Sequence, residues 1–242
     1  MSKVFKYQQF FERFREDSRV LDVGCGMGDL TARIARSLPD GYVLGTNLNC
    51  GDLTRAVRCY PRARYPNLRF LCADARTLRL PEEPFDFAVS RCCLHFVRRP
   101  GTCFSAIARN LKQGGCMHVW FYGHGHCRQI EDCLRTLISR VEWSSYFRNF
   151  QPSWHFVSPA SCQPWLREAG FVTRQLELKE EAVAFPNREV FLQWLRWAWG
   201  SYWEKVPRAR LEAFQKSFLE LYGNAKSYLA RKVWLIVEGV KR

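Results

Sequence analysis

The chain has 242 residues, of which 47% are hydrophobic and 25% are charged, and its formal net charge is +14 at pH 7. This length suffices for one globular domain with a substantial core, and no apolar run approaches the roughly 18 residues that a membrane-spanning helix needs. The first residues lack the apolar centre of a signal peptide, and the basic residues are scattered without a dense block, so neither a secreted protein nor a dedicated nucleic-acid binder is favoured.

The cysteine content predicts the cellular compartment. The chain has 11 cysteines, an odd number, and several of them lie inside apolar strand patterns: Cys72, Cys92, Cys93 and Cys116. Free thiols buried in a reducing compartment fit this pattern better than a disulfide framework does. We therefore expect a cytoplasmic protein with unpaired cysteines.

A glycine-rich stretch near the start of the chain organises the rest. Residues 20–23 are apolar except for Asp22, glycines follow at positions 24, 26 and 28, and apolar residues then recur at helical spacing as far as Leu38. This pattern predicts a strand, a tight loop and a helix. The third glycine of the dinucleotide fingerprint is replaced by Asp29, and no G-K-[ST] sequence forms a P-loop. Asp22 would repel a pyrophosphate but suits an ammonium or sulfonium ligand.

Strand and helix patterns alternate along the remaining chain. Further strands are expected at 41–49, 67–72, 85–91, 116–122, 171–178 and 233–240, with helices near 102–111, 130–137, 162–169, 190–198 and 208–221. Such alternation implies βαβ units and a parallel sheet. Ligands bind at the carboxyl ends of the strands in sheets of this kind.

Two stretches resemble a known enzyme family. The acid-x-G-x-G-x-G pattern from Asp22 to Gly28 resembles motif I of the class I S-adenosylmethionine (SAM) dependent methyltransferases. The segment Phe85–Val97 resembles motif IV of the small-molecule O-methyltransferases related to trans-aconitate and juvenile-hormone-acid methyltransferases, whose pattern is F-D-x-V-x-S-x-x-x-L-H-W-V. The turn before residue 116 and the segment Leu-Arg-Glu-Ala-Gly-Phe at 166–171 also match the family's sequence pattern.

The resemblance implies a fold and a set of cofactor contacts. The fold is α/β, a doubly wound Rossmann-like seven-stranded sheet with an antiparallel last strand and a helical cap. The implied cofactor is SAM. The residues that would contact it are Gln9, Asp22, Gly24, Cys25, Gly26, Gly28, Asn47, Leu48, Asp74, Ala75 and Ser90. Gln9 belongs to a leading segment that is short for the family, and an ordinary helix covering the core is an equal interpretation of it.

Asn47 is the sharpest departure from the family pattern. The end of the second strand is where nucleotide-binding sheets place a carboxylate that accepts from both ribose hydroxyls. An amide accepts at one oxygen only and carries no charge. The loss of charge assistance costs on the order of 1 kcal/mol, or roughly tenfold in affinity. Weaker SAM binding is one interpretation, and an altered or lost activity is the other.

His95 is the candidate catalytic residue, because it follows the carboxyl end of a central strand. It could orient a substrate oxygen or act as a base, or it could simply pack beneath the loop. Esterification of a carboxylate needs no base, since the acid is already ionised near neutral pH.

The second half of the chain supplies candidate substrate contacts. The aromatic stretch at 141–156 helps to cover the substrate in the resembling family, so Tyr146, Trp154 and His155 are pocket candidates, with core packing as the equal alternative. Residues His124, His126 and Cys127 are close together but lack the spacing of a zinc site, and no metal is expected.

The sequence thus predicts a single domain over residues 1–242. A nucleotide-binding core spans about 15–122 with strands near 171–178 and 232–240, and a cap comes from 1–14, 123–160 and 187–222. The expected activity is SAM-dependent methyl transfer to an oxygen of a small molecule, a carboxylate or a hydroxyl. An anionic or amphipathic acid fits the basic surface. Three alternatives stay open: a SAM-fold enzyme repurposed for a cyclisation or rearrangement, a non-catalytic binding module, and a nucleic-acid methyltransferase, although nucleic acid is not the expected partner.

Overall fold

The computed structural model describes residues 10–223 and 228–242, and these form two compact units. The first unit contains residues 10–124, 156–179 and 234–242. The second contains residues 125–155, 180–223 and 228–233, which include most of the segments assigned to a cap by the sequence. Gln9 lies outside the described residues.

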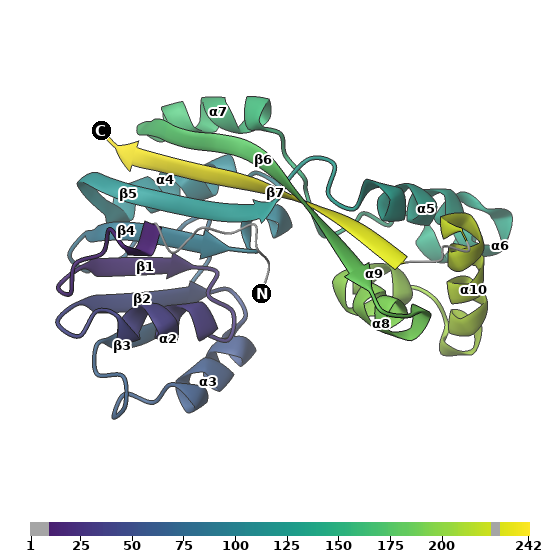
Figure 1. Ribbon diagram of the computed structural model, residues 1–242, viewed down its shortest axis with the longest axis horizontal. Helices are drawn as coiled ribbons and strands as arrows, with labels where there is room; N and C mark the ends of the chain where they lie inside the picture. Colours follow the sequence, from purple (N-terminus) through teal and green to yellow (C-terminus); the bar gives the residue numbers. More distant parts are fainter. Residues whose placement is uncertain (1–9, 224–227) are drawn as a thin grey trace. The chain divides into compact units, whose positions relative to one another are not determined.

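A seven-stranded sheet is the centre of the first unit (Figure 1). Its strand order is β3-β2-β1-β4-β5-β7-β6. The neighbours from β3 to β5 are parallel, whereas β7 runs antiparallel to β5. The fold class expected from the sequence, including the antiparallel last strand, is therefore confirmed. The strands are β1 (Arg19–Val23), β2 (Tyr42–Asn47), β3 (Leu68–Cys72), β4 (Phe85–Arg91), β5 (Leu111–Tyr122), β6 (Phe171–Phe185) and β7 (Tyr228–Lys241).

The topology fixes where a ligand can bind. The chain winds outward from β1 in both directions, first through β2 to β3 and then back to β4 on the other side. The loops that leave β1 and β4 at their carboxyl ends therefore diverge, and an open α/β sheet has its crevice at such a switch point. The glycine loop and the segment after β4 both belong to this edge.

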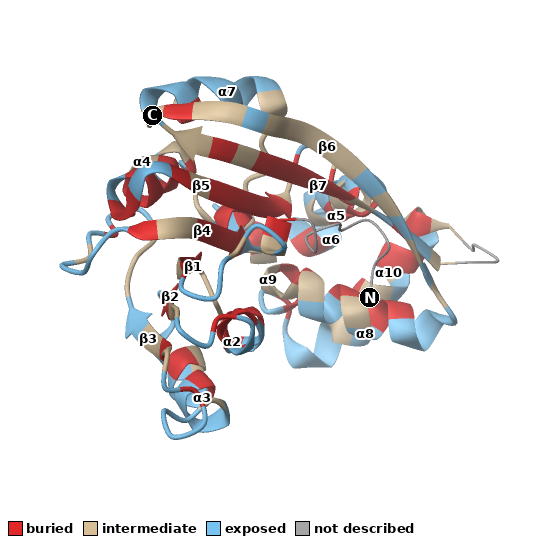
Figure 2. Cartoon of the chain, turned by 60° about the vertical axis from the view of Figure 1, so that its left-hand side comes forward, coloured by how far each residue is buried: buried red, intermediate tan, exposed pale blue. Residues whose placement is uncertain are grey.

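Helices cover the two faces of the sheet. Helix α2 (Asp29–Arg36) and α3 (Cys50–Cys59) contact β2 and β3, while α4 (Gly101–Asn110) contacts β5 and α7 (Pro159–Glu168). A short 3-10 helix, η1 (Leu94–Phe96), follows β4. Figure 2 shows α2 with a buried and an exposed side, as its apolar residues at helical spacing require.

Consecutive residues of a strand belong to two separate hydrophobic clusters, one on each face of the sheet. On β1, Val20 packs with the residues of α2, whereas Leu21 packs with those of α4 and α7. Val43 and Leu44 of β2 divide in the same way. This division follows from the two-residue period of a strand, and it explains why a sheet covered on both faces has nearly continuous apolar strands.

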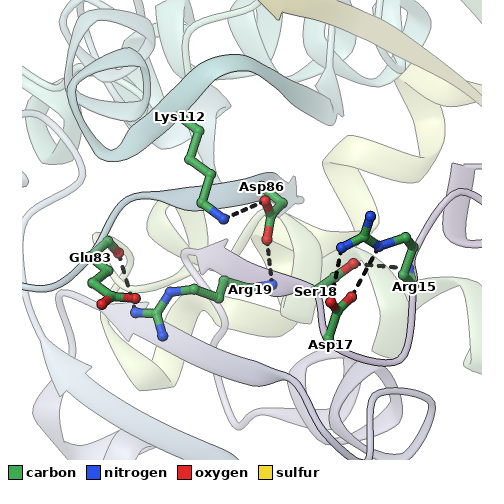
Figure 3. A network of polar contacts seen from close by, with 7 residues as sticks. All are labelled: Arg15, Asp17, Ser18, Arg19, Glu83, Asp86 and Lys112. Carbon is green, nitrogen blue, oxygen red and sulfur yellow. Dashed lines mark hydrogen bonds and ion pairs between the residues drawn. The ribbon is translucent and has the colours of Figure 1, made fainter.

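The amino-terminal edge of the sheet is closed by polar contacts (Figure 3). The Asp86 carboxylate accepts from the Arg19 backbone N–H at 2.8 Å and from the Lys112 ammonium at 2.7 Å, so it ties the start of β1 to β4 and β5. A cavity of about 290 Å³ lies here, lined by Asp86, Lys112 and Cys116 among others. Its position at the amino ends of the strands separates it from the edge where the sequence motifs meet.

Two strands differ from the expected boundaries. Strand β5 begins at Leu111 rather than at Cys116, because Phe85 pairs with Leu111 before residues 112–115 bulge and Phe87 pairs with Cys116. Strands β6 and β7 are also longer than expected. Strand β6 begins in the first unit and ends in the second, and β7 begins in the second unit and ends in the first.

The second unit consists of helices and the ends of β6 and β7. Rings from several helices form one aromatic cluster, in which Phe214 contacts Trp143, Phe147 and Trp203. The helices are α5 (Arg128–Ser139), α6 (Val141–Ser144), η2 (Ser145–Phe147), α8 (Arg188–Ala198), α9 (Gly200–Trp203), η3 (Arg208–Arg210) and α10 (Leu211–Tyr222). None of the helices within the described ranges is long and apolar enough to cross a membrane.

The expectation that the cysteines are unpaired is wrong for one pair. A disulfide joins Cys50 to Cys72, with their Cα atoms 5.6 Å apart. Cys72 was expected inside an apolar strand pattern, but β3 is the edge strand of the sheet and Cys72 is exposed. The other nine cysteines are free.

Candidate active site

The glycine loop follows β1 and is held against the neighbouring strand. The backbone N–H groups of Gly24 and Cys25 both donate to the carbonyl of Thr46 on β2, at 2.8 and 2.9 Å. Gly24, Gly26 and Gly28 all have positive φ angles, which side chains rarely adopt. The loop therefore has a fixed course before any ligand binds.

The three glycines differ in the space beside them. A Cβ at Gly24 would lie 2.2 Å from the Cys93 sulfur, and one at Gly28 would lie 2.6 Å from the Phe70 ring. At Gly26 a Cβ would meet nothing within 4 Å. Gly24 and Gly28 thus serve the packing of the loop, whereas Gly26 is the position where a ligand can approach the backbone.

Asp22 lies beneath the glycine loop rather than in it. The residue is 1% exposed, and its Oδ2 accepts a hydrogen bond of 2.7 Å from the Thr31 hydroxyl of α2. Burial raises the pKa of Asp22 to about 6, against the opposing influence of the Thr31 hydrogen bond and the Arg91 charge. At pH 7 the carboxylate is mostly ionised, so it places negative potential under the loop and anchors α2. The sequence could not show that Thr31 is its partner.

Asn47 ends β2 with one acceptor oxygen available. Its amide Nδ2 donates to the Asn49 carbonyl at 3.3 Å, which directs Oδ1 away from that contact. Asn49 accepts from the N–H groups of Gly51 and Asp52 and so caps α3. Leu48, between the two asparagines, is 67% exposed. The end of β2 therefore offers a hydrogen-bond acceptor at Asn47 and, at the next residue, the exposed apolar side chain of Leu48.

Asp74 follows β3 and is paired within its own loop. Both of its carboxylate oxygens accept from the Arg76 guanidinium, which lowers the pKa of Asp74. The Arg76 side chain is 58% exposed, and solvent screening leaves exposed pairs of this kind with little net stabilisation. The carboxylate can therefore exchange this partner for a ligand at little cost. Ala75 is half-buried beside it.

Ser90 is fully buried near the end of β4. Its hydroxyl donates to the Val23 carbonyl at 2.7 Å and joins β4 to β1 at the switch point. The sequence placed Ser90 beside a methionine moiety. Its hydroxyl proton is used within the sheet, and its oxygen keeps the capacity to accept. The next residue, Arg91, is exposed at the same edge, and its charge reaches Asp22.

His95 is buried in η1 and uncharged. Its Nδ1 accepts the backbone N–H of Tyr122 at 3.4 Å, and the ring packs at a tilt against the rings of Phe96 and Tyr122. Burial lowers the pKa of His95 to about 3. Since Nδ1 is an acceptor in a neutral ring, the proton is on Nε2. His95 is thus arranged as a hydrogen-bond donor rather than as a base.

The three residues predicted to contact a substrate all belong to the second unit. Tyr146 accepts at 3.5 Å from Arg210, and Trp154 packs edge-on against Trp199. The Trp154 indole nitrogen is buried and has no hydrogen-bond partner among the residues that the structure describes. His155 is half-buried.

Residues 124–127 do not converge on a common point. The His126 Nδ1 accepts from the Val233 backbone N–H at 3.2 Å, and its Nε2 lies 3.4 Å from the Cys127 sulfur. His124 is exposed. Within the described ranges no group of three or more such side chains could hold a metal ion. These residues form the turn that leads into α5.

Sequence reasoning missed several residues of this edge. The only sequence feature of Thr31 is a hydroxyl in the first turn of a helix, and that of Arg76 is its place two residues after an aspartate. No sequence pattern indicates that Cys50 pairs with Cys72. Arg91 occupies a variable position of the resembling motif, so nothing in the pattern singles it out.

The arrangement fits an adenosine-containing sulfonium cofactor. Gly26 leaves open backbone at the switch point, Leu48 offers an exposed apolar surface, and Asn47 offers an acceptor for a ribose hydroxyl. Negative potential from Asp22 favours a cationic ligand over a pyrophosphate. Asp74 can accept from an adenine amine once it leaves Arg76.

Comparison with known proteins supports the same view. Residues 20–115 match the family described as "Methyltransferase domain". A malonyl-acyl-carrier-protein O-methyltransferase of Paenibacillus sp. (strain JDR-2) is 22% identical over 232 residues, which are 91% of this chain and 82% of that protein. A trans-aconitate 2-methyltransferase of Methylobacterium nodulans is 32% identical over 102 residues, which are 42% of this chain and 37% of that protein.

The fold is shared with solved structures. A protein from Bacillus halodurans C-125, assigned as a methyltransferase, superposes with a TM-score of 0.66 at 17% sequence identity. The alignment covers 98% of this chain and 97% of the other.

Proposed function

We propose that this protein is a SAM-dependent methyltransferase that transfers the methyl group of SAM to an oxygen of a small molecule, and that the acceptor is a carboxylate. The match of residues 20–115 to a methyltransferase domain supports this proposal. The observation that carries the proposal is the glycine loop at the switch point, with Gly26 open to a ligand above the buried Asp22. SAM carries its methyl group on a positively charged sulfur, so a neutral thioether is the leaving group when the methyl group is transferred.

In this proposal, residues at different strand ends contact different parts of the cofactor. Gly26 and the loop backbone hold the amino-acid end, Asn47 accepts from a ribose hydroxyl, and Leu48 and Asp74 meet the adenine. The Ser90 hydroxyl keeps β1 and β4 in register and thereby holds the glycine loop in place. These contacts position rather than react, as expected for an in-line displacement that depends on proximity and alignment.

The state of His95 favours a carboxylate over a hydroxyl acceptor. A hydroxyl must lose its proton during transfer, and His95 is a poor proton acceptor because its pKa is lowered to about 3 and its Nδ1 is occupied. A carboxylate is already ionised near neutral pH and needs only to be oriented. The Nε2–H of His95 can donate to one carboxylate oxygen while the other attacks.

The charge at this edge supports an anionic acceptor. Arg91 is the exposed last residue of β4, and no hydrogen bond or ion pair engages its side chain within the described residues. A guanidinium beside the switch point attracts a carboxylate and steers its approach. Tyr146, Trp154 and His155 stay candidates for the apolar part of such a substrate. We further propose a cytoplasmic location, in keeping with nine free cysteines.

Calorimetric titration with SAM and with S-adenosylhomocysteine tests the cofactor site. We expect micromolar binding by the wild-type protein and none by Gly26→Val, with the variant's fold checked by circular dichroism. A panel of carboxylic acids and of matching alcohols is then incubated with SAM, and mass spectrometry detects products one methyl group heavier.

The alternatives give other outcomes. Cofactor binding without methyl transfer to any acceptor would favour a repurposed enzyme that carries out a cyclisation or rearrangement. Absence of cofactor binding would favour a non-catalytic binding module. Methylation of alcohols in preference to acids would contradict the role given to His95.

A further inference from the structure

We propose that the Cys50–Cys72 disulfide is a reversible thiol switch that holds the two adenosine-binding loops together, so that its reduction weakens cofactor binding. The inference rests on the proposed function, because that proposal assigns Asn47, Leu48 and Asp74 to adenosine. The switch would make cofactor affinity depend on whether Cys50 and Cys72 are oxidised or reduced.

The disulfide lies at the meeting point of the two loops. Cys72 is the last residue of β3 and pairs in register with Asn47, the last residue of β2. Cys50 is the first residue of α3, only three positions after Asn47. The bond therefore joins the end of β3, two residues before Asp74, to the exit of the β2 loop.

The short loop from β2 to α3 runs along the disulfide. The Leu48 carbonyl oxygen lies 3.6 Å from the Cys72 sulfur and 4.0 Å from the Cys50 sulfur. Leu48 itself is 67% exposed, so its side chain adds little to hold the loop. The disulfide thus restrains the part of the backbone that presents Leu48.

Backbone and capping hydrogen bonds also restrain this loop, since Asn49 caps α3 by accepting from the N–H groups of Gly51 and Asp52. The Ala73 N–H donates to the Asn47 carbonyl, and the Asn47 amide donates to the Asn49 carbonyl at 3.3 Å. Strand β3 is the outer strand of the sheet, so no further strand supports it. Without the disulfide, the loop must be ordered when the ligand binds, and that ordering opposes binding.

The disulfide is also accessible to a reductant. Cys50 and Cys72 are both exposed, whereas the free thiols of Cys103, Cys127 and Cys162 are buried. Burial raises the pKa of each of these three thiols to about 12, which keeps them protonated and unreactive. A reductant can therefore reach the Cys50–Cys72 bond, whereas these three buried thiols take no part in the exchange.

The chemistry is thiol–disulfide exchange with a small dithiol or with glutathione. A thiolate of the reductant attacks one sulfur, the Cys50–Cys72 bond breaks, and a mixed disulfide forms. A second reductant thiol resolves it, so Cys50 and Cys72 gain two electrons and two protons while the reductant becomes a disulfide. Glutathione disulfide reverses the reaction.

The test uses the full-length protein in two thiol states. Protein treated with glutathione disulfide is digested without reduction, and mass spectrometry is expected to find the peptide that links Cys50 to Cys72. Calorimetry with S-adenosylhomocysteine then compares this protein with protein held in dithiothreitol. We expect the Kd to rise about fivefold to tenfold on reduction.

Variants assign the effect to this pair. The double variant Cys50→Ser with Cys72→Ser should bind like the reduced wild type and should not respond to dithiothreitol. Cys59→Ser is the matched control, because Cys59 is exposed and free at the end of the same helix, and it should behave like the wild type.

Other outcomes overturn the proposal. Equal Kd values in the two thiol states, a double variant that still responds to dithiothreitol, or the absence of the linked peptide each contradict the switch. If Asn47 variants still change the Kd in those cases, the cofactor site stands and only the switch fails. No binding in either state contradicts the proposed function itself.

Discussion

The hydrogen-bonding capacity of single side chains decides how tightly the carboxyl edge of the sheet holds its ligand. Asn47 offers one uncharged acceptor where a carboxylate would offer two charged ones. Asp74 is engaged by Arg76 until a ligand competes for it. The edge is thus built for binding of moderate strength, and both positions are open to direct measurement.

Asn47→Asp should tighten SAM binding about tenfold, because charge-assisted hydrogen bonds to the ribose contribute on the order of 1 kcal/mol more than neutral ones. Calorimetric Kd values for the variant and the wild type provide the measurement. Asn49→Asp is the control, since aspartate also caps a helix and adds the same charge two residues away. An equal gain in both variants would indicate a general charge effect and not a ribose contact.

His95→Ala should lower turnover at least tenfold while leaving the Kd for SAM within about twofold, because the lost Nε2–H orients the acceptor and not the cofactor. Steady-state kinetics with the best carboxylic acid and calorimetry with SAM separate the two effects. Unchanged turnover would reduce His95 to a packing residue beneath the loop.

At the scale of elements, the strand–loop–helix unit from β1 to α2 combines two kinds of glycine. One kind is needed for the packing of the loop against the rest of the first unit, and the other leaves backbone open to a ligand. Stability and binding therefore separate along one loop of five residues, between Gly24 and Gly28.

Gly24→Ala and Gly26→Ala form a matched pair. At Gly24 the new Cβ would meet the Cys93 sulfur, and we expect a loss of about 2–4 kcal/mol in the free energy of unfolding from overpacking and the positive φ. At Gly26 only the positive φ opposes the side chain, so the loss should be about 1–2 kcal/mol.

Denaturant unfolding measures both losses, and calorimetry measures SAM binding by the folded variants. Gly26→Ala should bind SAM much more weakly than its small loss of stability would suggest, because its Cβ occupies the space of the ligand. Normal binding by Gly26→Ala would contradict the placement of the cofactor against this glycine.

At the scale of the whole molecule, buried ionisable groups set the dependence of stability on pH. Burial lowers the pKa of His95 to about 3 and that of His118 to about 4, whereas it raises the pKa of Asp22 to about 6. The unfolded chain binds protons at both histidines below about pH 6.5 while the folded chain does not, so stability falls as the pH falls. Asp22 acts in the opposite direction, because its folded form takes up a proton between about pH 6 and 4 before the unfolded form does.

We expect the free energy of unfolding to fall by about 2–3 kcal/mol between pH 7 and pH 5, since two histidines at about 2 kcal/mol each outweigh one aspartate at about 1 kcal/mol. His118→Gln should lose about 2 kcal/mol less over the same range. His118 lies on β5, separated from β1 by β4, and its ring stacks against Phe10, so we expect the variant to keep its SAM affinity. Denaturant unfolding at the two pH values measures the effect, and a parallel pH dependence of variant and wild type would contradict it.

The succession of elements could be predicted because its signals are local. The glycine spacing after Val23, the apolar period through Leu38 and the alternation of strands and helices each depend on neighbours a few residues apart. The boundaries of β5, β6 and β7 could not, because pairing with a distant strand or passage into the second unit decides where they begin and end.

The positions of the site residues were predictable, whereas their chemical states were not. By itself the sequence determined that Asp22, Asn47, Asp74 and Ser90 come to one edge of a parallel sheet, because parallel strands bring their carboxyl ends together. Only the tertiary structure decided that Thr31 binds Asp22, that the Ser90 hydroxyl is used within the sheet, that His95 is a neutral donor, and that Cys50 meets Cys72. Burial, protonation and pairing depend on atoms brought together from distant parts of the chain, and no local pattern records them.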